Sequence, residues 1–202
     1  MITVDDIRVA LSAHETQRAP FSADNSHAAV AMIVTDDLVE PEVCFIRRAE
    51  RDGDPWSGQV AFPGGRADAV DPHAAAVAER ETWEEIGLRL NAEQQIGALP
   101  IRPIERRDVR TSMTLSPFVY AVPSTVKSIA SPQQSEEVAS VFWVPMGHLF
   151  DPSAATDLEY AMGGNMMTFP GIQFEDHIIW GLTLRILSSF AEIMGHELAV
   201  EC

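Results

Sequence analysis

The sequence is poor in cysteine and in basic residues. Its only cysteines are Cys44, inside an apolar run, and Cys202, at the C-terminus. Two isolated cysteines form neither a disulfide framework nor a zinc cluster, which fits a reducing compartment. Lys and Arg number 14 against 30 Asp and Glu, a formal net charge of −16. This balance argues against the basic face needed to bind nucleic acid or an anionic membrane, although a bound divalent metal still permits an anionic small molecule.

Long apolar runs are also missing. No stretch reaches the roughly 18 apolar residues of a membrane span, and the first residues lack the basic start and apolar core of a signal peptide. We therefore expect a cytoplasmic protein. The 202 residues are 46% hydrophobic and contain no internal repeat, low-complexity tract or interdomain linker. We expect residues 1–202 to form a single domain.

Hydrophobic patterns predict one sheet with helices packed against it. Thr3 is a candidate N-cap of a helix that ends before Pro20 and covers the core. Two β-rich runs at 28–34 and 43–46 are expected to be neighbouring strands. The same reasoning predicts strands at 59–62, 96–99, 117–122 and 138–144, and a final helix over 177–194. This mixed order is typical of a sheet covered by helices.

A second predicted helix follows the break Pro63-Gly64-Gly65. Asp71 and Pro72 have the form of an N-cap and a first helical residue, and Gly87 has the form of a C-terminal stop. The spacing therefore predicts a helix over residues 71–86. The two glycines before it allow the backbone to approach a ligand or a metal closely.

Three glutamates on this helix are candidates for a metal site. Glu81, Glu84 and Glu85 stand at i, i+3 and i+4, so their carboxylates crowd one face and repel one another. A hard divalent cation would offset that repulsion, and Mg²⁺ commonly takes one or two carboxylates with waters and substrate phosphates. Arg80 can donate a planar fork to a neighbouring carboxylate and fix its orientation. The alternative interpretation is a solvated acidic helix face.

The segment 65–88 ends in Arg80-Glu81-Thr82-Trp83-Glu84-Glu85-Ile86-Gly87-Leu88. In this motif and in its glycine start, it resembles the Nudix box of the Nudix hydrolase superfamily. Relative to the family pattern, the distance from Gly65 to Arg80 is one residue longer, Asp71 stands where a glutamate is expected, and Thr82 replaces an apolar residue.

The longer spacing and the preceding Phe62-Pro63 are similar to the coenzyme A pyrophosphatase branch of that superfamily. Asp54 stands where the substrate motif of this branch usually has arginine. Likeness to the branch continues in residues 58–65, 116–119, 137–145 and 179–183.

The resemblance implies a Nudix-type α/β/α sandwich of the α/β (α+β) class, with a mixed sheet. It also implies hydrolysis of a nucleoside diphosphate derivative with Mg²⁺ or Mn²⁺ as cofactor. It assigns Glu81, Glu84, Glu85 and Gly65 to the metal site, with Glu81 and Glu85 as the leading ligands. Glu84, Glu85 and Arg80 are assigned to catalysis, where Glu84 is either a ligand or the general base.

If the substrate is coenzyme A, the products are 3′,5′-ADP and 4′-phosphopantetheine, and recognition of the extra 3′-phosphate requires basic side chains. The candidates form a cluster between predicted strands: Arg102, Arg106, Arg107 and Arg110. The alternative is a solvated loop that balances acidic neighbours. Trp56 either stacks on a base or anchors packing, and Trp83 and Trp180 are expected in helix cores.

Three functions are compatible with these residues. The first is hydrolysis of coenzyme A or acyl-coenzyme A, and the second is hydrolysis of ADP-ribose or nucleotide sugars. The third, a catalytically silent Nudix-fold binding protein, ranks last because Glu81, Glu84 and Glu85 are all present. The sequence predicts a small-molecule partner and neither nucleic acid nor membrane, and it leaves open whether the chain acts as a monomer or a homodimer.

Overall fold

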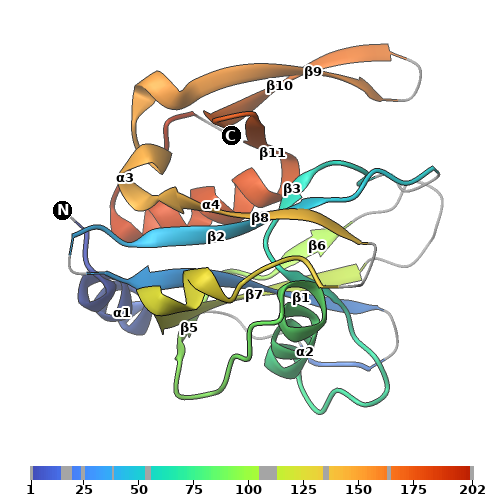
Figure 1. Cartoon of the computed structure of the whole chain (residues 1–202), viewed down its shortest axis with the longest axis vertical. Coiled ribbons are helices and arrows are strands. Elements are labelled where there is room, and N and C mark those ends of the chain that lie inside the picture. Colours follow the sequence, from blue (N-terminus) through green and yellow to red (C-terminus); the bar gives the residue numbers. More distant parts are fainter. Residues whose placement is uncertain are drawn as a thin grey trace.

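The computed structural model describes residues 2–14, 20–23, 26–37, 39–52, 56–104, 113–133, 137–162 and 165–200. Its elements in chain order are α1 (Val4–Ala13), β1 (His27–Asp36), β2 (Glu42–Arg48), β3 (Val60–Ala61), β4 (Gly64–Arg66), α2 (Ala74–Ile86), β5 (Gln95–Ala98), β6 (Arg102–Ile104), β7 (Met113–Pro123), the 3₁₀ helix η1 (Ser124–Ser128), β8 (Val138–Pro145), α3 (Met146–Leu149), the 3₁₀ helix η2 (Pro152–Ala154), β9 (Ala155–Met162), β10 (Asn165–Phe174), β11 (His177–Trp180) and α4 (Gly181–Met194). Figure 1 shows their arrangement.

The larger sheet is mixed, as predicted. Within the described ranges it has eight strands, with the path β3-β2-β1-β7-β5 and with β4, β6 and β8 paired to β1, β7 and β2. The central strand β1 runs parallel to β7 and antiparallel to β2 and β4. The predicted pairing of the two runs at 28–34 and 43–46 is therefore confirmed. The parallel pair brings together segments that lie far apart in the sequence.

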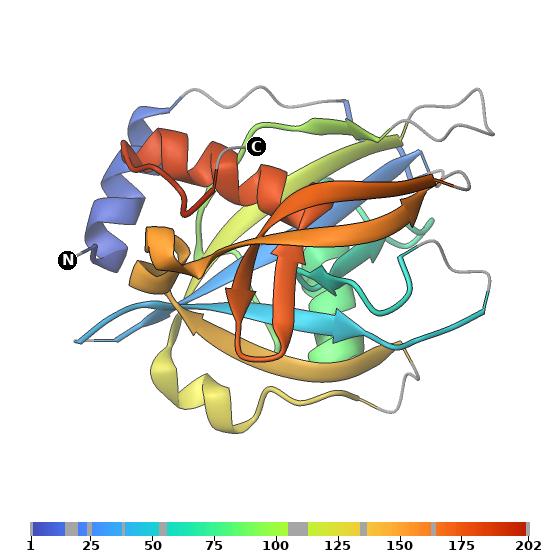
Figure 2. The same cartoon turned by 90° about the horizontal axis from the view of Figure 1, so that it is seen from above.

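Helices cover both faces of this sheet, which confirms the α/β/α sandwich. Successive side chains of a strand point to opposite faces. Ala31 and Ile33 of β1 accordingly pack with Val77 of α2, whereas Met32 packs on the other face with Phe190 of α4. Figure 1 shows α2 and α4 on opposite sides of β1, and Figure 2 shows α1 beside α4. The prediction that the first helix covers the core is confirmed.

A smaller antiparallel sheet, in the order β11-β10-β9, precedes α4. It corrects the prediction of one helix over 177–194, because His177–Trp180 is a strand paired with β10 and the helix begins at Gly181. In a short apolar run such as Ile178-Ile179-Trp180, periodicity alone does not show whether the residues form a strand or a helix. Gly181 has φ +63°, the left-handed conformation that turns the chain from β11 into α4.

Two other local predictions meet different outcomes. Thr3 caps α1 as predicted, in a capping box in which its Oγ1 accepts from the Asp6 N–H at 3.2 Å. The second helix begins later than predicted, at Ala74, because His73 caps it through Nδ1. The carboxylate of Asp71 is instead held elsewhere, as described below.

The predicted core position of Trp83 is wrong. This side chain is 42% exposed and stacks under the guanidinium of Arg89, which lies 3.8 Å from the ring centroid. Trp180 is buried, but it lies at the end of a strand. In the part of the chain that the structure describes, no helix combines the length and apolar character needed to cross a membrane.

Phe190→Ala tests the packing of α4 on the sheet. Phe190 is fully buried, so we expect the free energy of unfolding to fall by about 3–5 kcal/mol, measured by urea denaturation. Trp83→Ala serves as the control, because an exposed ring should contribute about 1 kcal/mol or less. Equal losses in the two variants would contradict the assignment of these faces.

Candidate active site

The backbone of β4 lies tightly between β1 and α2. A Cβ atom on Gly64 would stand 2.3 Å from the carbonyl oxygen of Ala29, and a Cβ atom on Gly65 would stand 2.4 Å from the carboxyl carbon of Glu81. Gly64 also has φ +153°. Its N–H donates to Oε2 of Glu85 at 2.9 Å. The two glycines thus place main chain directly against two carboxylates of α2.

The three predicted glutamates lie in different surroundings. Glu85 is only 3% exposed, and burial raises its pKa to about 8, although the N–H of Gly64 opposes the shift. Burial also raises the pKa of Glu81, against the opposing charge and hydrogen bond of Arg80. The side chain of Glu84 is 52% exposed. Glu81 and Glu85 line a cavity that is described below, whereas Glu84 is not among the residues that line it.

Arg80 organises this end of the helix. Its Nε and Nη2 donate to the two carboxylate oxygens of Asp71 at 3.0 and 2.9 Å. Its Nη1 donates to Glu81 at 2.9 Å and to Glu84 at 3.0 Å, and Nη2 also donates to the carbonyl oxygen of Arg66 at 3.0 Å. The expected donation from Arg80 to a neighbouring carboxylate is confirmed, and one guanidinium holds three acidic side chains.

Asp71 anchors this arginine from the loop before the helix. Burial opposes ionisation of Asp71, but the hydrogen bonds from Arg80 and from the N–H of Asp68 outweigh it and hold the pKa of Asp71 below its usual value. The pKa of Arg80 is raised, mainly by the same contact with Asp71. Asp71 is therefore an ionised partner of Arg80 and not the helix cap that the sequence predicted.

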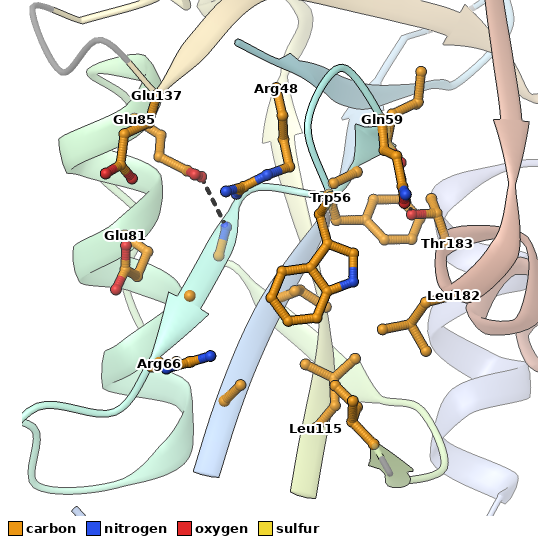
Figure 3. A pocket seen from close by; sticks show the side chains of 18 of the residues that line it. Arg48, Trp56, Gln59, Arg66, Glu81, Glu85, Leu115, Glu137, Leu182 and Thr183 are labelled. Atoms are coloured by element: carbon orange, nitrogen blue, oxygen red, sulfur yellow. Dashed lines mark hydrogen bonds between the residues drawn. The ribbon is translucent and has the colours of Figure 1, made fainter. Parts of the chain in front are cut away.

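A cavity of about 550 Å³ opens beside these carboxylates. Glu81 and Glu85 stand on one side of it, and the cavity is also lined by Arg48, Arg51 and Arg66. Figure 3 shows Arg48 and Arg66 on different sides of the same space. Carboxylates and guanidinium groups that share one cavity suit a ligand that carries both metal and phosphate.

Sequence reasoning missed Glu137 and these three arginines. Glu137 lines the cavity and accepts from Nη1 of Arg51 at 3.2 Å. Arg48 ends β2, where the pairing with β8 shifts register between Arg47 and Arg48, and such bulges redirect side chains. The likeness of segment 137–145 to a known branch was the one sequence signal for Glu137. Arg48 and Arg51 come near Arg66 because β1 pairs with both β2 and β4.

The predicted substrate arginines lie elsewhere or are not described. Arg102, in β6, donates to the carbonyl oxygen of Arg185 at 3.0 Å and to Ser189, both on α4. It does not line the cavity. The other three candidates fall outside the described residues: Arg106, Arg107 and Arg110.

The donor set fits a metal site that a ligand completes. Among the described residues, no three carboxylate, imidazole or thiolate side chains converge as a full protein ligand set. Mg²⁺ commonly binds one or two carboxylates and takes its other oxygens from water and phosphate. Glu81 and Glu85 offer two such carboxylates beside Gly65. Burial disfavours the charge of Glu85 in the folded chain, and a divalent cation would offset that effect.

Comparisons with known proteins agree with this geometry. A family model described as "NUDIX domain" matches residues 25–162. The chain is 31% identical over 178 residues to an uncharacterized Nudix hydrolase NudL from Yersinia enterocolitica, covering 88% of this chain and 86% of that protein. It is 32% identical over 139 residues to the protein of the same description from Salmonella paratyphi B, covering 69% and 68%.

A solved structure has a similar fold. The MutT/nudix family protein from Enterococcus faecalis superposes with a TM-score of 0.57 at 14% identity, covering 96% of this chain and 75% of that one. The likeness therefore covers nearly the whole chain.

Glu85→Gln tests the cost of burying this carboxylate. The folded pKa of about 8 lies above the ordinary value of 4.5. The unfolded chain therefore ionises first, and stability of the metal-free protein falls as the pH rises from about 4.5 to about 8. We expect Glu85→Gln to raise the unfolding free energy by a few kcal/mol at pH 8 and by almost nothing near pH 4.5. Glu93→Gln, at an exposed position, should follow the wild type; parallel profiles for all three proteins would refute the assignment.

Asp71→Asn tests the anchor of Arg80 and has the opposite pH dependence. The folded pKa of Asp71 lies below 3.8, so its contribution is present above that pH and is lost as the pH falls through the folded value. We expect a loss of about 2 kcal/mol at pH 7 that narrows below pH 4, measured by chemical denaturation. A loss that persists unchanged at low pH would assign the effect to packing and not to the ion pair.

Proposed function

The chain belongs to the Nudix hydrolase family, and from this premise we propose that it uses Mg²⁺ or Mn²⁺ to cleave the diphosphate of coenzyme A or acyl-coenzyme A. As a Nudix hydrolase it acts on pyrophosphate bonds. The products would be 3′,5′-ADP and 4′-phosphopantetheine or its acylated form. The observation that carries the proposal is the shared cavity, in which Glu81 and Glu85 stand with three arginines and an apolar wall.

Glu81 and Glu85 would hold the cation, with the backbone around Gly65 close to it. A bound cation would neutralise charge on the anhydride and lower the pKa of a coordinated water. Arg80 sets the rotamer of Glu81 through its hydrogen bond, and Asp71 sets the position of Arg80. Glu84 contacts Arg80 at the surface, so its part in catalysis would be electrostatic support of this arginine.

The remaining polar groups would bind the substrate and move a proton. Arg48, Arg51 and Arg66 can donate to phosphate oxygens from different sides of the cavity. A diphosphate and a 3′-phosphate are separate anions, and Arg48 and Arg66, which lie on different sides of the cavity (Figure 3), would meet different groups. Glu137, held by Arg51, would accept the proton of the attacking water as general base, a role that Glu85 could take instead.

A second candidate function is hydrolysis of ADP-ribose or nucleotide sugars. Trp56 favours any substrate that carries a base, since its ring lies in the cavity (Figure 3) and offers a face for stacking. The carboxylates serve both candidates equally. The two candidates differ in the 3′-phosphate, which coenzyme A alone carries, and in the group on the far side of the diphosphate.

The discriminating experiment compares substrates under one set of conditions. Coenzyme A, ADP-ribose and a nucleotide sugar are each incubated with Mg²⁺ or Mn²⁺, and products are identified by mass. We expect the highest kcat/KM for coenzyme A, with release of 3′,5′-ADP, and a loss of about 100-fold or more in Glu81→Gln and in Glu85→Gln. Glu93→Gln is the matched control and should retain full activity.

Other outcomes would decide against the proposal. A higher kcat/KM for ADP-ribose or a nucleotide sugar would replace coenzyme A by the second candidate. Absence of turnover with every substrate, in a folded protein, would favour the binding-protein alternative.

A further inference from the structure

The wall of the cavity opposite the glutamates is aliphatic. It is built from β1, β6, β7 and α4, whose side chains at this place are Val30, Ile104, Met113, Leu115, Leu182 and Ile186. Leu115 and Ile186 are almost completely buried, and Leu182 is half-buried at the start of α4. Figure 3 shows Leu115 and Leu182 across the cavity from Glu81 and Glu85. A ligand held by the carboxylates therefore extends onto apolar surface.

Thr183 follows Leu182 on this wall, and its hydroxyl already has a hydrogen-bond partner. The hydroxyl of Thr183 is buried and donates to the carbonyl oxygen of Val60 at 2.9 Å. A sugar placed against Leu115, Leu182 and Ile186 would lose water from its hydroxyls without gaining hydrogen bonds from these three side chains, which is unfavourable. An aliphatic group placed there would lose only the water around apolar surface, which is favourable.

We propose that the wall of Leu115, Leu182 and Ile186 selects substrates with a branched aliphatic carbon next to the phosphate ester. This inference rests on the proposed function. In coenzyme A, the CH₂ bonded to the phosphate oxygen is attached to a carbon that carries two methyl groups. In ADP-ribose and nucleotide sugars, a hydroxylated sugar ring occupies the same place. The wall thus distinguishes the two candidate functions by the group beyond the diphosphate.

Leu182 is the side chain to change. It lies on the first turn of α4 and is only half-buried, so a polar replacement there perturbs the core less than one at Ile186. Leu182→Asn replaces two methyl groups by an amide of similar size. Leu182→Val keeps the wall aliphatic and is the conservative comparison. Met166→Gln is the control, because Met166 is 64% exposed on β10 and outside the cavity lining.

The first readout is the specificity of turnover. For coenzyme A, we expect kcat/KM to fall about tenfold in Leu182→Asn and by less than about threefold in Leu182→Val. The inhibition constant of ADP-ribose, as a competitor that shares the diphosphate, should stay within about twofold of the wild-type value in both variants. Equal weakening of coenzyme A and ADP-ribose in Leu182→Asn, or no change in either, would overturn the inference.

The second readout separates this inference from the proposed function. Binding of 4′-phosphopantetheine and of ribose 5-phosphate to the full chain is measured by calorimetry with Mg²⁺ present. Tighter binding of 4′-phosphopantetheine, lost in Leu182→Asn and kept in Met166→Gln, supports the aliphatic wall even if coenzyme A is not cleaved. Equal binding of the two monophosphates overturns the inference that the wall is selective, even if coenzyme A is cleaved.

Discussion

The close approach of β4 to its neighbours is the constraint on which the site depends. Gly64 and Gly65 leave no room for a Cβ atom between Ala29 on one side and Glu81 on the other. The pairing of β4 with β1, in which Val30 lies opposite Gly64, fixes the position of this backbone relative to the sheet. Because α2 packs directly on that backbone, the carboxylates of Glu81 and Glu85 face main chain and cavity and are largely withdrawn from bulk solvent.

That arrangement divides the acidic residues into two electrostatic classes. Asp71 lies in the fork of Arg80, and its pKa is lowered. Glu85 has the N–H of Gly64 as a direct partner, and burial dominates, so its pKa is raised. Environments that push pKa values of neighbouring carboxylates apart are typical of catalytic sites. Here the ionised Asp71 holds Arg80 in place, while burial disfavours the charge of Glu85, an effect that a nearby cation would offset.

The parts predicted correctly are those that depend on local spacing. The i, i+3, i+4 pattern placed the glutamates on one helix, and the capping residues of α1 marked its start. The parts missed depend on distant pairing. Arg48 and Glu137 meet because β2 pairs with β8 across about ninety residues of chain. Of the predicted arginines, which lie close together in sequence, Arg102 is described and contacts α4 instead of the cavity. Strand β11 was predicted as helix because the periodicity of so short an apolar run does not distinguish a strand from a helix. Only its pairing with β10 shows that it is a strand.

The chain's net charge of −16 opposes binding of an anionic substrate, but the electrostatic field of exposed charges has a short range in salt solution. At physiological ionic strength, exposed charges are screened beyond about 8–10 Å. Groups inside the cavity therefore matter more than the net charge, and Arg48, Arg51 and Arg66 are three of the chain's 14 basic side chains there. Burial raises the pKa of Glu81 and of Glu85 in the same space, so their negative charge is disfavoured in the metal-free chain. Under the proposed function, a cation held by Glu81 and Glu85 would restore the charge of both carboxylates and add positive charge beside the arginines, so it would support substrate binding as well as the chemical step.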